Sequence, residues 1–256
     1  NYRSILPKEK IRLDELLVNR GFCSDEKRAV SLILSGSVLV ENQKVTKAGL
    51  KFLTDVNIRL IEKIPDTVSR AGKKLNHALD IFKIYATGKI CLDFGASTGG
   101  FTEALLEKGA EKVYAFDVGY GQIAGKLRND QRVIVQDRFN VKNISTSDFS
   151  INEKPVLIVM DLSFISLLSI FPVVANFKKD FPDVNFEIVS LIKPQFECSA
   201  KDLEKGIVKK KGIHFKVIRK ICKSVISEHD GKIKGLCESP ILGAKGNKEF
   251  FIYWIL

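Results

Sequence analysis

The sequence predicts an α/β protein in which a small α+β domain precedes a mostly parallel, doubly wound sheet with an antiparallel edge. From Lys89 onward, short apolar runs alternate with helical patterns, as in parallel sheets whose strands are joined by helices. These expected strands lie near 90–94, 112–117, 132–136, 156–161 and 186–192. The chain ends in two further apolar runs, 233–237 and 249–255, which we expect to form the antiparallel edge. Residues 1–62 carry shorter predicted helices and strands that do not follow this alternation.

The elements of residues 1–62 follow from local spacing and turn residues. Apolar residues at helical spacing predict a helix from Ile11 to Leu17, and Ser24 is the expected cap of a second helix over Asp25–Ser35. The expected strands are 38–40, 44–45 and 56–60, with a hairpin turn at 41–43. Exposed basic residues on such a domain suit phosphate contacts on structured RNA, although a solvated helix face is the alternative. The candidate RNA-binding residues are Arg12, Arg20, Lys27 and Arg28.

Pro65 and Asp66 mark a linker over 63–68, because proline ends the preceding strand. The second domain therefore spans 69–256 and opens with a helix that runs to about Tyr85. Within it, the apolar stretch from Phe164 to Phe177 is shorter than the roughly 18 residues that a membrane span needs, and we expect a core helix there. We expect no stable membrane association.

Composition points to an anionic partner. The chain carries 41 lysines and arginines against 30 acidic residues, which gives a net charge of +11. Such an excess favours nucleic acid or an anionic membrane surface, although it also occurs in basic proteins without such a partner. The 5 cysteines are scattered and form no C-x-x-C pair, which indicates a reducing, cytoplasmic compartment and argues against a zinc site or a disulfide framework. We expect no metal.

The stretch from Lys89 to Phe101, K-I-C-L-D-F-G-A-S-T-G-G-F, organises the second domain. A buried strand ends at Asp93, and a glycine-rich loop then leads into a helix. Because glycine has no Cβ, a ligand can approach the backbone of such a loop closely. The next strand ends at Asp117, about 20 residues after the glycines, where an acid would meet ribose hydroxyls.

Two cofactor classes fit this arrangement in outline. A dinucleotide site requires G-x-G-x-x-G, but the loop here reads G-A-S-T-G-G and lacks the second glycine of that motif. The carboxylate of Asp93 would repel a pyrophosphate, whereas it suits the amino acid end of S-adenosylmethionine. The pattern favours a methyl-donor site, and an ordinary β–α turn is the alternative.

We expect four charged residues to lie together at one edge of the sheet. Asp161 and Lys193 each follow a buried strand, Glu249 opens the last strand, and Lys74 comes from the helix before the first strand. Charged groups at the ends of apolar strands are poorly solvated, so they should pair with one another. Such a group could position a ribose 2′-hydroxyl and remove its proton. Ordinary surface salt bridges are the alternative.

Two resemblances carry these hypotheses further. The pattern R-L-D-x-L-L-V-x-R-G followed by S-G-x-V-L-V-x-x-x-x-V resembles the small RNA-binding domain of ribosomal protein S-four type, or αL motif. Nearly the whole chain resembles the TlyA family, also called hemolysin A, of S-adenosylmethionine-dependent rRNA 2′-O-methyltransferases. The motifs that carry this resemblance are S-R-A-G-K-K-L (69–75), D-F-G-A-S-T-G-G-F-T (93–102), D-V-G-Y-G-Q (117–122), K-L-R-N-D (126–130), D-L-S-F-I-S-L (161–167), I-K-P-Q-F-E (192–197) and G-N-K-E (246–249).

The TlyA resemblance implies a Rossmann-like methyltransferase fold, S-adenosylmethionine as cofactor and a cytidine of ribosomal RNA, on ribosomal subunits, as substrate. It also implies a catalytic tetrad of Lys74, Asp161, Lys193 and Glu249, although either Lys73 or Lys74 could face the site. The implied cofactor-binding residues are Asp93, Gly95, Ala96, Ser97, Gly99, Gly100, Phe101, Asp117, Val118, Asp137 and Asp161. The alternatives are a membrane-acting hemolysin and a non-catalytic RNA-binding protein, and the oligomeric state stays open.

Overall fold

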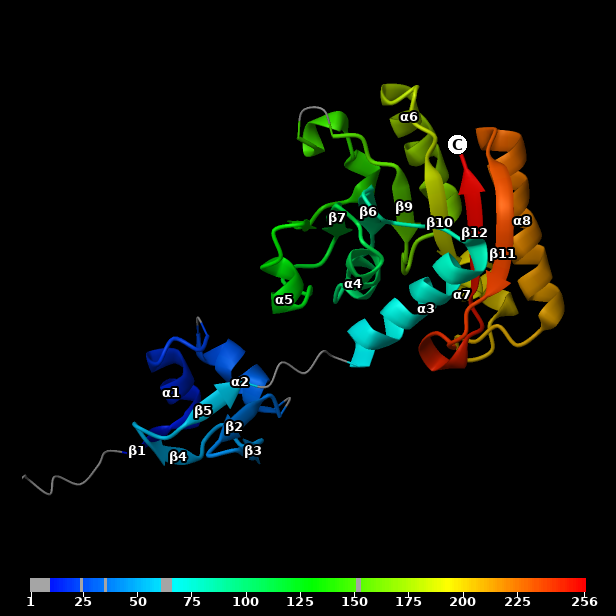
Figure 1. Ribbon diagram of the computed structural model, residues 1–256. Coiled ribbons are helices and arrows are strands. Elements are labelled where there is room, and N and C mark those ends of the chain that lie inside the picture. The colour runs from blue at the N-terminus through cyan, green and yellow to red at the C-terminus, as the bar shows by residue number, and fades with distance from the viewer. Residues whose placement is uncertain (1–9, 24, 35, 61–65, 151–152) are drawn as a thin grey trace, which may run out of the picture. The chain divides into compact units, whose positions relative to one another are not determined.

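The structure is a computed structural model that describes residues 10–23, 25–34, 36–60, 66–150 and 153–256 (Figure 1). The chain divides into two compact units, Asn1–Ile64 and Pro65–Leu256. The linker predicted at 63–68 lies partly outside the described residues, and its last part is helical, because the first helix of the second unit begins at Asp66.

The first unit packs two short helices against short strands. Its elements are β1 (Lys10–Arg12), α1 (Leu13–Asn19), α2 (Glu26–Leu34), β2 (Val38–Val40), β3 (Gln43–Val45), β4 (Lys51–Leu53) and β5 (Ile58–Leu60). The strands form a three-stranded sheet in the order β3-β2-β5 and a separate β1-β4 pair. Apolar residues from α1, α2 and β2 make one core, which includes Leu13, Leu16, Leu17, Ala29, Ile33 and Val38.

The first helix begins later than predicted. Ile11 and Arg12 are extended, because β1 pairs antiparallel with β4 and sets Ile11 opposite Phe52. Neither β1 nor β4 was predicted, because Ile11 and Arg12 belong to the spacing that indicated a helix and the three residues of β4 are too few to display a clear period of two. The expected cap Ser24 lies outside the described residues, and the carboxylate of Asp25 accepts a hydrogen bond of 2.8 Å from the Arg28 N–H at the start of α2.

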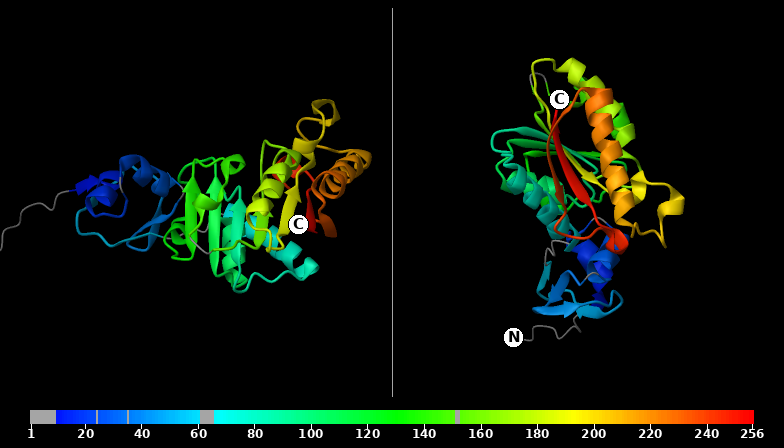
Figure 2. Two further views of the ribbon diagram at one scale, coloured as in Figure 1. Left: turned by 90° about the horizontal axis from the view of Figure 1, so that it is seen from above. Right: turned by 90° about the vertical axis from the view of Figure 1, so that its right-hand side faces the viewer.

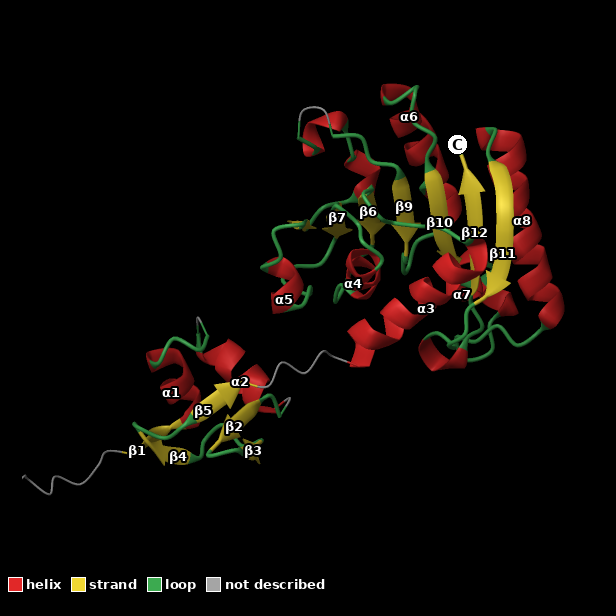
Figure 3. Cartoon of the chain, in the orientation of Figure 1, coloured by secondary structure: helices red, strands yellow, loops and turns green. Residues whose placement is uncertain are grey.

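The second unit is built on one seven-stranded sheet in the order β11-β12-β10-β9-β6-β7-β8 (Figure 3). The strands are β6 (Ile90–Phe94), β7 (Lys112–Asp117), β8 (Val133–Asp137), β9 (Leu157–Met160), β10 (Glu187–Ile192), β11 (Lys232–Glu238) and β12 (Phe250–Ile255). The α-helices are α3 (Asp66–Phe82), α4 (Gly100–Glu107), α5 (Gly125–Arg128), α6 (Phe171–Asp180), α7 (Pro194–Glu197) and α8 (Lys211–His229). Strand β12 runs antiparallel to both β10 and β11, whereas β6 to β10 are mutually parallel. The mostly parallel sheet and its antiparallel edge are therefore confirmed.

Helices cover both faces of this sheet. Alternate residues of each strand enter different cores: Val159 of β9 packs with Leu75 of α3 and Leu105 of α4, whereas Ile158 packs with Phe171 of α6 and Ile221 of α8. Strand residues alternate between faces with a period of two, so both faces of a buried strand must be apolar. In the right-hand view of Figure 2, α3 (cyan) and α8 (orange) lie on opposite sides of β12 (red).

The helix predicted over the apolar stretch 164–177 is wrong for its first half. Residues 167–169 form a single 3-10 turn, and α6 begins only at Phe171. The hydroxyl of Ser166 accepts a hydrogen bond of 3.2 Å from the Leu168 N–H, which caps the short turn. Proline is favoured in the first turn of a helix, so Pro172 places the start of α6 there. Phe164, expected in the core, is 90% exposed.

Candidate active site

Strand register brings three of the four predicted tetrad residues to one edge of the sheet. Parallel pairing sets Phe94 of β6 opposite Met160 of β9, so the following residues, Gly95 and Asp161, are neighbours. A Cβ at Gly95 would lie only 2.8 Å from the carbonyl oxygen of Asp161. Antiparallel pairing sets Ile192 of β10 opposite Phe250 of β12, so Lys193 and Glu249 leave the sheet at the same end.

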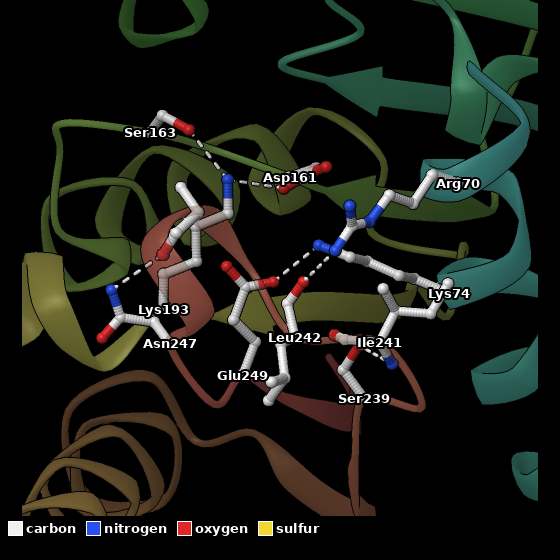
Figure 4. Close-up of polar contacts among 11 residues, drawn as sticks. Arg70, Lys74, Asp161, Ser163, Lys193, Ser239, Ile241, Leu242, Asn247 and Glu249 are labelled. Atoms are coloured by element: carbon white, nitrogen blue, oxygen red, sulfur yellow. Dashed lines mark hydrogen bonds and ion pairs between the residues drawn. The ribbon is translucent and has the colours of Figure 1, made fainter. Parts of the chain in front are cut away.

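The tetrad forms two ion pairs with little access to solvent (Figure 4). Lys193 Nζ lies 2.7 Å from Asp161 Oδ1, and the two side chains are 11% and 19% exposed. Lys74 Nζ lies 2.7 Å from Glu249 Oε2, and these side chains are 11% and 2% exposed. Because a buried charge is costly unless it is paired, each pair fixes the position of both its members.

The structure distinguishes the two candidate lysines of α3. Lys73 is exposed, whereas Lys74 is buried beside Leu75 and contacts Glu249. Arg70 lies one helical turn before Lys74, on the same face of α3, and its Nη2 donates a hydrogen bond of 3.0 Å to the carbonyl oxygen of Leu242 (Figure 4). Sequence reasoning missed Arg70, although its spacing of four residues from Lys74 was the available signal.

A pocket of about 450 Å³ opens beside Asp161 and is here called the main pocket. Its lining residues are Gly95, Ser97, Phe116, Asp117, Val118, Gln122, Phe139, Asn140, Val141, Asp161, Leu162, Ser163, Phe164, Ile165 and Ile170. Five of the predicted cofactor residues are in this lining, namely Gly95, Ser97, Asp117, Val118 and Asp161. Sequence reasoning missed the wall formed by 162–165, because a core helix was expected from Phe164 onward and no role was given to the two residues before it.

Asp117 fixes the shape of the glycine loop. Its Oδ2 accepts a hydrogen bond of 2.8 Å from the Ser97 N–H, and its Oδ1 accepts one of 2.7 Å from the Gly119 N–H. Ser97 has a positive φ of 49°, which a residue with a side chain adopts only when its surroundings hold it. The Ser97 hydroxyl donates to Gln122 Oε1 at 3.3 Å. The acid at the end of β7 therefore holds the loop that lines the main pocket.

The other six predicted cofactor residues are not in this lining. Ala96 and Gly99 are buried residues of the glycine loop, Gly100 and Phe101 are buried at the start of α4, and a Cβ at Gly99 would come within 2.3 Å of Leu127 Cδ1. Asp137 instead pairs with Arg128, whose Nη2 lies 2.7 Å from its Oδ2.

Asp93 is fully buried at the end of β6. Its Oδ2 accepts a hydrogen bond of 2.6 Å from the Thr102 hydroxyl, whereas its Oδ1 has no hydrogen-bond partner among the described residues. Burial raises the pKa of Asp93 to about 7, with nearby Asp161 adding to the shift. Asp93 is not among the residues that line the main pocket, so its unused acceptor is closed off from solvent in this structure.

The loop between β9 and α6 is clamped against α7. Glu197 accepts hydrogen bonds of 2.6 Å from the Ser166 hydroxyl and 2.7 Å from the Leu167 N–H, and burial raises the pKa of this carboxyl. The ring of Phe164 lies 5.1 Å from that of Phe196, centroid to centroid, and Phe164 has a positive φ of 63°. The clamp holds an exposed aromatic ring at the rim of the main pocket.

The four candidate RNA-binding residues of the first unit are all exposed. Arg12 lies in β1 and pairs with Asp14 at 2.6 Å. The Arg20 side chain donates to the carbonyl oxygen of Val56 at 2.6 Å and stacks on Phe22. Lys27 and Arg28 lie together in the first turns of α2.

Residues 67–255 match the family described as FtsJ-like methyltransferase, which is the span of the sheet, the glycine loop and the tetrad. The chain belongs to this family. Hemolysin A of Brachyspira hyodysenteriae is 41% identical over 247 residues, which are 96% of this chain and 100% of the relative. The 16S/23S rRNA (cytidine-2′-O)-methyltransferase TlyA of Mycobacterium tuberculosis (strain ATCC 25618 / H37Rv) is 36% identical over 251 residues, 95% of this chain and 89% of the relative. The resemblance to the TlyA family is thus confirmed.

A solved structure from Streptococcus thermophilus, named as a hemolysin, has 34% sequence identity and a TM-score of 0.68, with 97% of this chain and 89% of that chain covered. Among the described residues, no helix combines the length and apolar character needed to cross a membrane. The same residues hold no group of three or more His, Cys, Asp or Glu side chains placed to bind a metal ion.

Proposed function

We propose that this chain transfers a methyl group from S-adenosylmethionine to the ribose 2′-hydroxyl of a cytidine in ribosomal RNA. The observation that carries the proposal is the placement of the Lys193–Asp161 pair, whose carboxylate lines the main pocket. We assign proton removal and orientation of the hydroxyl to this pair, beside the pocket that Gly95 and Ser97 of the glycine loop help to line. The relative from M. tuberculosis is named for this activity.

The residues of the main pocket fit the cofactor. Asp93 is fully buried and does not line the main pocket, but its Oδ1 has no hydrogen-bond partner among the described residues, and we assign it to the amino group of the methionine end. Asp117 offers carboxylate oxygens to ribose hydroxyls, and Phe116, Phe139 and Ile170 give the pocket an apolar side suited to a base. A bound cofactor supplies a methyl group on a positively charged sulfur, so the protein contributes position, desolvation and proton removal.

Lys193 is the side chain that we assign to the 2′-hydroxyl. Asp161 and Ser163 hold its Nζ from two sides, at 2.7 and 2.8 Å. Nζ would hold the 2′-hydroxyl by a hydrogen bond and, once its own proton had passed to solvent, would accept the hydroxyl proton, and Asp161 would stabilise the ammonium that forms. The pair of Lys74 and Glu249 brings a further positive and a further negative charge to the same edge, which orients the groups around Lys193.

The RNA substrate is held in two places. The exposed ring of Phe164 suits stacking on an unpaired base, which is how proteins bind bases that leave a helix. The first unit, which we propose is of ribosomal protein S-four type, presents Arg12, Arg20, Lys27 and Arg28 to the phosphate backbone. Ribosomal subunits are the expected partner, and the cytoplasm is the expected compartment.

The test is transfer of tritiated methyl from S-adenosylmethionine to purified ribosomal subunits. We expect Lys193→Ala to lower the rate by about 10²- to 10⁴-fold, the usual contribution of a general base, while calorimetry finds unchanged cofactor affinity. Lys248→Ala is the matched control, since Lys248 is exposed, pairs with Glu238 at 2.7 Å and lines neither the main pocket nor the pocket beside Arg70. A full rate in Lys193→Ala would refute the assignment. Lysis of liposomes by the same preparation tests the alternative of a membrane-acting hemolysin.

A further inference from the structure

A second pocket is lined by Arg70, Lys74 and the segment 242–246, and it shares no lining residue with the main pocket. We name it the basic pocket, and its volume is about 360 Å³. We propose that it binds a phosphodiester group of the RNA strand that carries the target ribose. The inference rests on the proposed function and adds a specific substrate contact to it.

The charge of the basic pocket favours an anion. Its walls carry three cationic side chains, Arg70, Lys74 and Lys245. Lys74 is already paired with Glu249, but neither Arg70 nor Lys245 has a carboxylate partner among the residues whose side chains are described. Two cations without a carboxylate partner on residues that line one cavity repel each other, and a phosphate group bound between them would offset that repulsion.

The pocket is held in shape by buried contacts. Asn247 is 2% exposed, and its Nδ2 donates hydrogen bonds of 3.0 Å to the carbonyl oxygens of Gly206 and of Ala244. Its Oδ1 accepts a hydrogen bond of 2.9 Å from the Val208 N–H. The segment that carries Lys245 is therefore fixed to the preceding loop, and Arg70 attaches the same segment to α3 through Leu242.

The place of the pocket fits the chemistry of a nucleotide. Lys74 belongs to both the basic pocket and the tetrad, and its partner Glu249 leaves the sheet beside Lys193. In RNA, the 2′-hydroxyl and the 3′-phosphate are attached to adjacent carbons of one ribose. A phosphate in the basic pocket would thus fix the sugar whose hydroxyl faces Lys193 and the main pocket. Phosphate contacts position a nucleic acid without reading its sequence.

The experiment measures methyl transfer to ribosomal subunits by Arg70→Gln, Lys245→Gln and the control Lys248→Gln. We expect each pocket variant to raise the KM for subunits about tenfold, as loss of a charge-assisted hydrogen bond predicts. Each should also lower the slope of log affinity against log salt by about 1, while Lys248→Gln behaves as the unchanged chain. Lys245→Arg should restore the KM, because it restores the charge.

Cofactor affinity and the thermal midpoint of each variant separate a lost contact from a damaged fold. A KM and salt slope equal to those of Lys248→Gln in both pocket variants would overturn the inference, while the proposed function would stand. A raised KM that Lys245→Arg fails to restore would also overturn it. The absence of methyl transfer by the unchanged chain would instead refute the proposed function.

Discussion

The buried pair of Lys74 and Glu249 gives the sharpest prediction. Replacing one member should destabilise the fold far more than replacing both. The atoms Lys74 Nζ and Glu249 Oε2 lie 2.7 Å apart with side chains 11% and 2% exposed. Removing one partner of such a pair leaves an unpaired charge out of water and costs about 3–5 kcal/mol. With a urea slope of about 2 kcal/mol per M, the unfolding midpoint should fall by about 2 M.

The assay is a double-variant cycle on Glu249→Leu, Lys74→Met and the two combined. We expect each single change to destabilise by the amount above and the combined change to recover most of the loss, because apolar residues of similar size replace a buried pair at little cost. Methyl transfer should stay lost in the combined variant. Single losses below about 1 kcal/mol, the range of exposed pairs, would refute the reasoning.

Three further predictions concern the rim and base of the main pocket. Phe164→Ala should raise the KM for ribosomal subunits with unchanged cofactor affinity, since base stacking is worth about 1–3 kcal/mol; an unchanged KM would contradict the role of the ring. Glu197→Gln should lower kcat more than it lowers cofactor affinity, because the hydrogen bonds from Ser166 and Leu167 to the residue 197 side chain weaken. Rates of methyl transfer measured across pH would test this effect. Burial raises the pKa of Asp93 to about 7, so this group makes the cofactor-free fold lose stability as the pH rises from about 4 to about 7. Thermal unfolding of Asp93→Asn should lack that loss, and an identical pH profile would contradict it.

The sequence predicted the architecture and the meeting of Asp161, Lys193 and Glu249 at one edge of the sheet, because both depend on where apolar runs end; the catalytic role of these residues stays a prediction. Asp161 and Lys193 directly follow buried strands, so the parallel register alone brings them to one edge. Glu249 could be placed for the same reason, since β12 begins at the next residue.

The rest depended on competing local signals. The apolar stretch that starts at Phe164 has no clear period, and only the hydrogen bonds of Ser166 and Glu197 decide that it is a loop. Asp137 was expected at the cofactor. Its distance along the sequence from Arg128 did not indicate that the two side chains would pair. Arg70 lies in the S-R-A-G-K-K-L motif (69–75) but was given no role, although it lines the same pocket as Lys74.

The most direct test identifies the methylated nucleoside by mass spectrometry of digested subunit RNA after incubation with S-adenosylmethionine. We predict that 2′-O-methylcytidine forms with the unchanged chain and is absent with Lys193→Ala, although both bind the cofactor equally. A methyl group found on a base, or 2′-O-methylcytidine formed equally by Lys193→Ala, would contradict the assignment of the strand-end lysine to a ribose hydroxyl.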